Sequence, residues 1–186
     1  MENFQKYLKI PLDKLIVLWY NKDMKKAFVF DFDDTLATTD CQVLVRNSVG
    51  YITKRLSPAE FNTNELEFDE QYDFKQFRSE KFIHNANPTF LIHLAKEVHD
   101  EGHAVYVLTA RADNVADAIA DWLCGFDVKA VKVFGVGSDD KKVNIAEEKQ
   151  KVLETLKQLF DLVYFYDDDQ HNVDLANRVG IKTYLV

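Results

Sequence analysis

Residues 27–36 read Ala-Phe-Val-Phe-Asp-Phe-Asp-Asp-Thr-Leu, an apolar run that ends in a cluster of acids. We predict a buried strand that delivers Asp31 and Asp33 to its carboxyl end, because residues two apart in an extended chain project to one side. Two other apolar runs end in the same way, Val105–Leu108 at Thr109 and Leu162–Tyr166 at Asp167 and Asp168. Ligands bind outside the carboxyl ends of strands in open parallel sheets, so the three strand ends predict one shared site.

Near-continuous apolar strands alternate with amphipathic segments over residues 27–186, a pattern typical of a parallel sheet covered on both faces. The predicted fold is therefore a Rossmann-like, doubly wound, mostly parallel α/β core. Helix signals are clear at Pro88–Glu101, with Asn87 as the cap and Gly102 as the stop. Residues 135–137, Gly-Val-Gly, are predicted to form a turn.

The chain is expected to fold as one domain over residues 1–186, with two segments outside the alternation of strand and helix. Residues 1–26 are predicted to form a helical extension, with a short helix near Leu12–Tyr20. Residues 41–86 interrupt the core segments 27–40 and 87–186, and two runs within them, Gln42–Arg46 and Tyr51–Leu56, predict a hairpin. Long insertions beside a site are commonly lids, so we interpret residues 41–86 as a small cap after the first strand.

Composition excludes several classes of protein. The formal net charge of −8 argues against an extended nucleic-acid-binding face. Cys41 and Cys124 form no CxxC motif, which indicates free thiols in a reducing compartment. The beginning of the sequence lacks a long apolar segment and no stretch approaches a membrane span, so we expect a soluble, cytoplasmic protein with no membrane partner. The sequence leaves the oligomeric state open.

A carboxylate that attacks a phosphate needs positive charge nearby, and the helix predicted over residues 145–160 offers it. Lys149 shares a helical face with Val152, Leu153 and Leu156, whereas Lys151 faces away. Lys149 is therefore the predicted phosphate-binding lysine. Lys141 and Lys142, which precede the helix, remain alternatives because loop lysines can reach into a site.

The ordered set Asp31-Phe-Asp33-Asp-Thr35, Thr109, Lys149 and Asp167-Asp168 resembles the four motifs of the haloacid dehalogenase (HAD) superfamily of phosphohydrolases. The resemblance spans residues 27–186. Two stretches, Thr-Ala-Arg at 109–111 and Phe-Tyr-Asp-Asp-Asp-Gln-His-Asn at 165–172, are also similar to small viral and bacterial HAD proteins, including the phosphatase domains of polynucleotide kinases.

The resemblance implies an aspartyl-phosphate on Asp31, with Asp33 as general acid and then base, and with Thr109 and Lys149 binding the phosphoryl group. It implies Mg²⁺ as the cofactor, held by Asp31, the Asp33 carbonyl and Asp167. Asp168 and Asp169 keep the identity of the last ligand open, since both are adjacent acids. Thr35 and Arg111 are further expected substrate-binding residues.

The substrate expected is a phosphorylated small molecule or a nucleic-acid end, such as a nucleotide or a polynucleotide 3′-phosphate. Arg55 on the predicted hairpin is the proposed contact, and Tyr51 and Tyr72 offer aromatic surfaces for a base. These aromatic residues equally suit packing of the cap onto the core. Two other functions remain open, a phosphotransferase of the same fold and a non-catalytic binding or regulatory protein.

Overall fold

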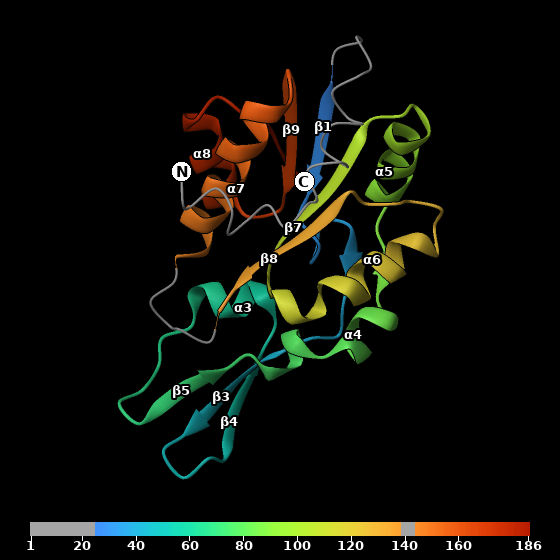
Figure 1. Ribbon diagram of the computed structural model, residues 1–186. Coiled ribbons are helices and arrows are strands. Elements are labelled where there is room, and N and C mark those ends of the chain that lie inside the picture. Colours follow the sequence, from blue (N-terminus) through green and yellow to red (C-terminus); the bar gives the residue numbers. More distant parts are fainter. Residues whose placement is uncertain (1–24, 139–143) are drawn as a thin grey trace.

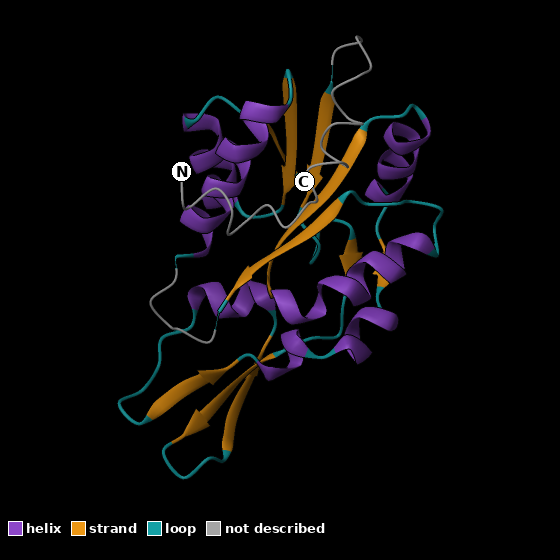
Figure 2. Cartoon of the chain, viewed as in Figure 1, coloured by secondary structure: helices purple, strands orange, loops and turns teal. Residues whose placement is uncertain are grey.

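A five-stranded sheet forms the centre of the computed structural model, which describes residues 25–138 and 144–186 (Figures 1 and 2). The strand order is β10-β9-β1-β7-β8 and all neighbours are parallel. The strands are β1 (Lys26–Phe30), β7 (Ala104–Ala112), β8 (Lys132–Gly137), β9 (Leu162–Asp167) and β10 (Lys182–Leu185). The predicted parallel α/β core is confirmed. The helix predicted near Leu12–Tyr20 and the alternatives Lys141 and Lys142 lie outside the described residues.

Helices cover both faces of this sheet, as the alternating pattern predicts (Figure 1). Residues of β1 alternate between the faces, with Phe28 and Phe30 in one core cluster and Ala27 and Val29 in the other. The first cluster is closed by α5 (Leu91–Asp100) and α6 (Ala116–Cys124), and the second by α7 (Ile145–Leu159) and α8 (Gln170–Arg178). No helix in the described ranges has the length and apolar character that a membrane span requires.

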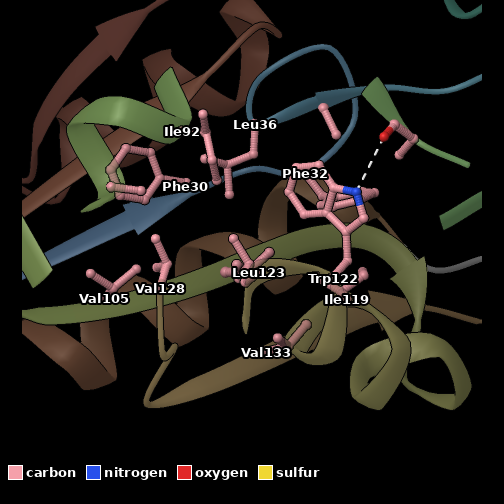
Figure 3. Close-up of a cluster of buried hydrophobic side chains, with 14 of the residues drawn as sticks. Phe30, Phe32, Leu36, Ile92, Val105, Ile119, Trp122, Leu123, Val128 and Val133 are labelled. Atoms are coloured by element: carbon pink, nitrogen blue, oxygen red, sulfur yellow. Dashed lines mark hydrogen bonds between the residues drawn. The ribbon is translucent and has the colours of Figure 1, made fainter. Parts of the chain in front are cut away.

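The first cluster extends beyond β1 to the loop that carries the acids (Figure 3). Phe32 and Leu36 are completely buried there, and the Phe32 ring meets Trp122 of α6 edge to face. The Trp122 indole donates a hydrogen bond to the Ala86 carbonyl. Full burial of each such side chain stabilises the fold by about 1.5–3 kcal/mol. Phe32 therefore fixes the backbone between Asp31 and Asp33 to the core.

The inserted segment contains a small antiparallel sheet of order β4-β3-β5 (Figure 1). Val43, Val45 and Leu56 form its apolar centre, against which Phe61, Tyr72 and Phe77 pack. The predicted hairpin is confirmed, and a third strand is added to it. The elements are β3 (Val43–Asn47), β4 (Ile52–Leu56), α3 (Pro58–Thr63), β5 (Glu70–Asp73), the 3₁₀ helix η1 (Lys75–Arg78) and α4 (Glu80–His84). We call this segment, Val43–His84, the cap.

The two crossings between core and cap pair with each other. β2 (Ala37–Thr38) and β6 (Asn87–Pro88) form a short antiparallel ladder. The prediction that Asn87 caps a helix from Pro88 is therefore wrong, because these residues are extended and α5 begins at Leu91. The hydroxyl of Thr89 lies just before α5 instead: it accepts a hydrogen bond from the Leu91 amide and donates one to the Thr35 carbonyl.

Strands β7 and β8 run further than the sequence predicted. β7 continues past Thr109 to Ala112, with an irregular register against β8 between those residues. Gly135 and Gly137 belong to β8, so the predicted turn is wrong. A Cβ atom at Gly137 would collide with the carbonyl oxygen of Ala110. Glycine is needed because the extended end of β7 lies so close, and the extension carries Arg111. A second 3₁₀ turn, η2 (Asp113–Val115), links it to α6.

Candidate active site

Asp31, Lys149 and Asp167 meet at the carboxyl edge of the sheet. Asp31 follows β1 and Asp167 ends the neighbouring β9, and the Asp31 amide bonds to the Tyr166 carbonyl at 2.9 Å. Lys149 comes from α7, and its Nζ lies 2.6 Å from Oδ1 of Asp31 and 2.7 Å from Oδ2 of Asp167. All three side chains are buried. The lysine therefore bridges two carboxylates in a site shielded from water.

Burial governs the charges of this group. It raises the pKa of Asp31 well above its usual value, and the nearby acids raise it further, whereas the Lys149 cation opposes the change. Burial by itself lowers the pKa of Lys149, but Asp31 and Asp167 more than offset this, so the net shift is upward. Lys149 consequently stays protonated, and its charge favours the anionic form of Asp31 against the effect of burial.

Asn172 is a site residue that the sequence predictions did not include. It lies on α8, is buried, and its amide donates to both carboxylate oxygens of Asp167, at 3.0 and 3.2 Å. The backbone amide of Asp169 also donates to Asp167, at 2.9 Å. A signal was present in the sequence, because an amide residue at the start of a helix that follows an acidic strand end is placed to turn back toward that acid.

Asp33 and Arg111 form the second charged pair of the site. The guanidinium binds both oxygens of Asp33, through Nε at 2.8 Å and Nη2 at 2.7 Å. Arg111 is only 2% exposed, whereas the Asp33 side chain is 20% exposed. Sequence reasoning expected Arg111 to bind substrate; in the structure its guanidinium points to Asp33 and the cap.

The two predicted threonines, Thr35 and Thr109, are both buried. The Thr109 hydroxyl, at the carboxyl side of β7, accepts a hydrogen bond from the Arg111 amide at 3.1 Å, which leaves its proton available to donate. The Thr35 hydroxyl is buried and has no hydrogen-bond partner within the described part of the chain. Two hydroxyls with unused donor capacity thus lie in this part of the fold.

Arg55 is placed apart from the groups above. It lies on β4, opposite Leu44 in the antiparallel register, and its side chain is exposed. In the described residues, no ion pair or hydrogen bond joins Arg55 to the acids, to Lys149 or to Arg111. Its expected role is therefore confined to a substrate that extends over the cap.

Asp168 is exposed at the mouth of the site. Although solvent reaches it, the protein around its base desolvates the carboxylate, and together with the neighbouring Asp167 this raises its pKa to about 6. Asp34 lies beside it with a left-handed backbone (φ 57°), and burial and the charge of Asp33 raise the pKa of Asp34. The mouth therefore concentrates negative charge and favours a cation.

The donor set suits Mg²⁺. In the described ranges, no three His, Cys, Asp or Glu side chains converge as a ready-made metal site. Mg²⁺ does not need one, because it commonly binds one or two carboxylates and keeps several waters. Asp31 and Asp168 could each supply a carboxylate oxygen, and the carbonyl of Asp33 could supply a third hard oxygen. Asp167 already accepts bonds from Lys149, Asn172 and Asp169, so its oxygens are more fully engaged.

Comparison with known proteins identifies the same architecture. Neither a protein-family model nor a curated protein sequence matches the chain. A chain of the Pnkp1/Rnl/Hen1 complex superposes with a TM-score of 0.59 at 15% identity, over 89% of this chain and 46% of that one. A putative phosphatase from Clostridium difficile gives a TM-score of 0.52 at 17% identity, over 87% and 85% of the two chains.

A third similar structure is a haloacid dehalogenase-like hydrolase from Streptococcus pneumoniae, with a TM-score of 0.49, 16% identity and coverage of 87% and 84%. This chain spans less than half of the matched chain of the Pnkp1/Rnl/Hen1 complex. At such identities the likeness establishes the fold. The predicted Rossmann-like α/β fold is confirmed at that level, and the chain is similar in fold to the Pnkp1/Rnl/Hen1 chain and to the putative phosphatase.

Proposed function

We propose that this chain is a Mg²⁺-dependent phosphomonoester hydrolase that works through an aspartyl-phosphate on Asp31. The observation that carries the proposal is the contact of Lys149 with Asp31 and Asp167 in a buried site at the carboxyl edge of the sheet. A carboxylate next to a fixed cation can approach an anionic phosphate, because the cation offsets the repulsion between them.

The residues divide the reaction into two steps. In the first, an Asp31 oxygen attacks phosphorus, the bond from phosphorus to the ester oxygen breaks, and Asp33 gives a proton to the departing oxygen. In the second, water attacks the phosphorus while Asp33 takes a proton from it, and the bond to Asp31 breaks. In this mechanism Lys149 and the Thr109 hydroxyl stabilise the charge on the phosphoryl oxygens.

The proposed Mg²⁺ would be held by Asp31, the Asp33 carbonyl and one carboxylate from Asp167 or Asp168. Bound there, it would neutralise charge shared by the carboxylates and the phosphate. We favour Asp168 as the side-chain ligand from β9, because Asp167 already orients Lys149. Burial and the neighbouring Asp167 raise the pKa of Asp168, and a cation bound there would offset both effects.

The proposed substrate is a nucleotide or a polynucleotide 3′-phosphate end. Arg55 gives the cap an exposed cation, and Tyr51 is 71% exposed at the turn of the hairpin, where a base can stack. Tyr72 is less suited to stacking, because its ring packs on Phe61 and its hydroxyl bonds to Asn64. The similar Pnkp1 structure belongs to an RNA repair complex, which favours testing such ends first.

Hydrolysis of p-nitrophenyl phosphate and a panel of phosphomonoesters, with Mg²⁺ or with EDTA, tests the proposal. We expect phosphate release that requires Mg²⁺ and a phosphorylated protein that denaturing mass spectrometry detects during turnover. Transfer of the phosphate to added alcohols in preference to water would favour a phosphotransferase. Absence of both release and labelling across the panel would favour a binding protein.

A further inference from the structure

Arg111 connects three parts of the molecule through one buried guanidinium. Two of its nitrogens bind the two oxygens of Asp33. A bidentate pair of this kind fixes the orientation of a carboxylate as well as its distance. Asp33 is therefore positioned by a residue of β7, although it lies on the loop after β1.

Arg111 also contacts the cap and the segment between β2 and β3 that leads into it. Nη1 donates to the Phe77 carbonyl on η1 at 3.0 Å, and the guanidinium lies 5.1 Å from the centre of the Phe77 ring. Nη2 also reaches the Thr39 hydroxyl and the Cys41 sulfur, both at 3.3 Å. Any shift of the cap relative to the core must alter these contacts.

The core itself is built to hold Arg111 in this place. The irregular end of β7 carries the residue beyond Thr109, and Gly137 of β8 allows the close approach of the two strands. On the core side, the guanidinium lies 5.7 Å from the centre of the fully buried Phe32 ring. The core consequently fixes the position of the Arg111 side chain, whereas some contacts of its guanidinium depend on the cap.

This arrangement has a consequence for Asp33. Both of its oxygens accept hydrogen bonds from Arg111, and Oδ1 also accepts one from the Thr39 hydroxyl at 3.1 Å. A carboxylate has about four lone-pair sites, so these three bonds leave little room for the proton that Asp33 gives to a departing oxygen. Arg111 and Thr39 therefore determine which oxygen of Asp33 can carry that proton and in which direction it points.

We propose that Arg111 is a positioning residue and not a phosphate ligand. It couples the position of the cap to the orientation and hydrogen bonding of the Asp33 carboxylate. Contacts to Phe77 hold the guanidinium, and the guanidinium holds Asp33. Movement of the cap over a bound substrate changes the first set of contacts and thereby the second. The kinetic test of this coupling rests on the proposed phosphatase function, whereas its structural test does not.

The kinetic test compares substrates that differ in their need for an acid. p-Nitrophenyl phosphate has a leaving group that departs without a proton, whereas an alkyl phosphate such as glycerol phosphate requires one. General acid–base catalysis contributes about 10²–10⁴-fold to the rate. Arg111→Gln should therefore lower kcat for both esters unequally, with a loss for the alkyl ester that is about tenfold larger than the loss for the aryl ester. The competitive inhibition constant of inorganic phosphate should stay close to that of the wild type.

Further variants keep this test decisive if Arg111→Gln folds poorly. Thr39→Val and Phe77→Leu each remove one support of the pair and should give the same selectivity in a weaker form. Phe61→Leu is the matched control, because Phe61 packs in the cap against Tyr72 and Phe74 but does not contact Arg111. Equal losses for both esters, with weaker inhibition by phosphate, would show that Arg111 is a phosphate ligand and would overturn the proposal.

The structural test uses hydrogen–deuterium exchange and needs no activity. If Asp33 and the cap are coupled through Arg111, Asp33→Asn should speed exchange at η1, where the Phe77 and Ser79 amides donate to the Phe74 and Gln76 carbonyls. Asp168→Asn is an equally conservative control in the same site. Unchanged exchange over residues 75–84 in Asp33→Asn would refute the coupling, whether or not the chain hydrolyses phosphate.

Discussion

The ammonium nitrogen of Lys149 lies 2.6 Å from Oδ1 of Asp31, and both side chains are almost fully buried. Removing one member of a buried ion pair leaves the other charge without compensation. Removal of Lys149 should therefore disfavour the anionic form of Asp31 and weaken the proposed attack on a phosphate.

Lys149→Met should lower kcat by about 10²–10³-fold, as expected when one group that stabilises transition-state charge is lost. Lys151→Met is the matched control, because Lys151 pairs with Glu148 on the exposed side of the same helix and should retain activity. A large defect in Lys151→Met, or normal turnover in Lys149→Met, would contradict the assignment.

Lys149→Met should also change how the stability of the protein depends on pH. The pKa of Asp31 is already raised above its usual value of 3.8, and loss of the cation that opposes this shift should raise it further. A carboxyl with a raised folded-state pKa favours the folded protein less as pH rises above 3.8, because the unfolded chain ionises more easily. Thermal unfolding from pH 4 to pH 8 should therefore show a steeper loss of stability in Lys149→Met than in the wild type.

Asp31→Asn and Asp33→Asn should fail at different steps. Without the nucleophile, Asp31→Asn should form no covalent phosphoprotein and should lose turnover. Asp33→Asn should lower kcat by about 10²–10⁴-fold for alkyl esters and less for p-nitrophenyl phosphate, because only the former require a proton for departure. Mass spectrometry after rapid quenching distinguishes the two variants. Labelling of Asp31→Asn would be incompatible with the proposed mechanism.

Asp168 and Asp167 should differ in their effects on Mg²⁺. Asp168→Asn should weaken Mg²⁺ binding while the protein remains folded, and in EDTA it should be more stable than the wild type at pH 7. The sign follows from its pKa, since ionisation between the usual 3.8 and about 6 costs the folded state stability that an amide does not lose.

Asp167→Asn should instead destabilise the protein, because it removes a buried partner of Lys149 and Asn172. Thermal unfolding with and without Mg²⁺ measures both effects. A stabilisation by Mg²⁺ that is equal in Asp168→Asn and the wild type would exclude Asp168 as the ligand.

Gly137→Ala should lower the free energy of unfolding by about 1–3 kcal/mol, the usual cost of forcing extra atoms into a packed site. The added methyl group would meet the Ala110 carbonyl, next to Arg111. Gly102→Ala provides a useful contrast, since nothing lies near its Cβ position and only its positive φ of 83° opposes the change. Chemical denaturation of both variants separates the steric effect from the backbone effect.

The hydrophobic pattern of the sequence was sufficient to predict the central sheet and the inward direction of Lys149. Apolar runs placed Asp31 and Asp167 at strand ends, whereas Thr109 lies within β7, and the helical spacing of Lys149 with Leu153 and Leu156 indicated its inward direction. These features are local, so the sequence expresses them directly.

Non-local features could not be predicted in the same way. The extension of β7 depends on close approach to Gly137, and the pairing of Asn87 with Thr38 joins residues separated by the whole cap. The contact of Arg111 with Asp33 likewise requires the relative placement of two strands and η1. A motif can suggest that an arginine near a threonine binds phosphate, but only the three-dimensional arrangement shows that its donors are engaged by an aspartate.

Arg55 provides the test of the substrate. It is exposed on the cap, in an otherwise acidic chain, and should neutralise a phosphate of an extended substrate without contacting the reacting group. Arg55→Ala should therefore raise KM for a 3′-phosphorylated oligonucleotide and flatten its dependence on salt, because each neutralised phosphate releases counterions. It should leave kcat unchanged, together with hydrolysis of p-nitrophenyl phosphate. Lys81→Ala on the exposed face of α4 is the control for loss of one positive charge.

The opposite outcome would be a higher kcat/KM for glycerol or sugar phosphates than for the oligonucleotide, with neither value changed by Arg55→Ala. The substrate would then be a small phosphate ester, and Asp31 and Asp33 would act without help from the β4-β3-β5 sheet.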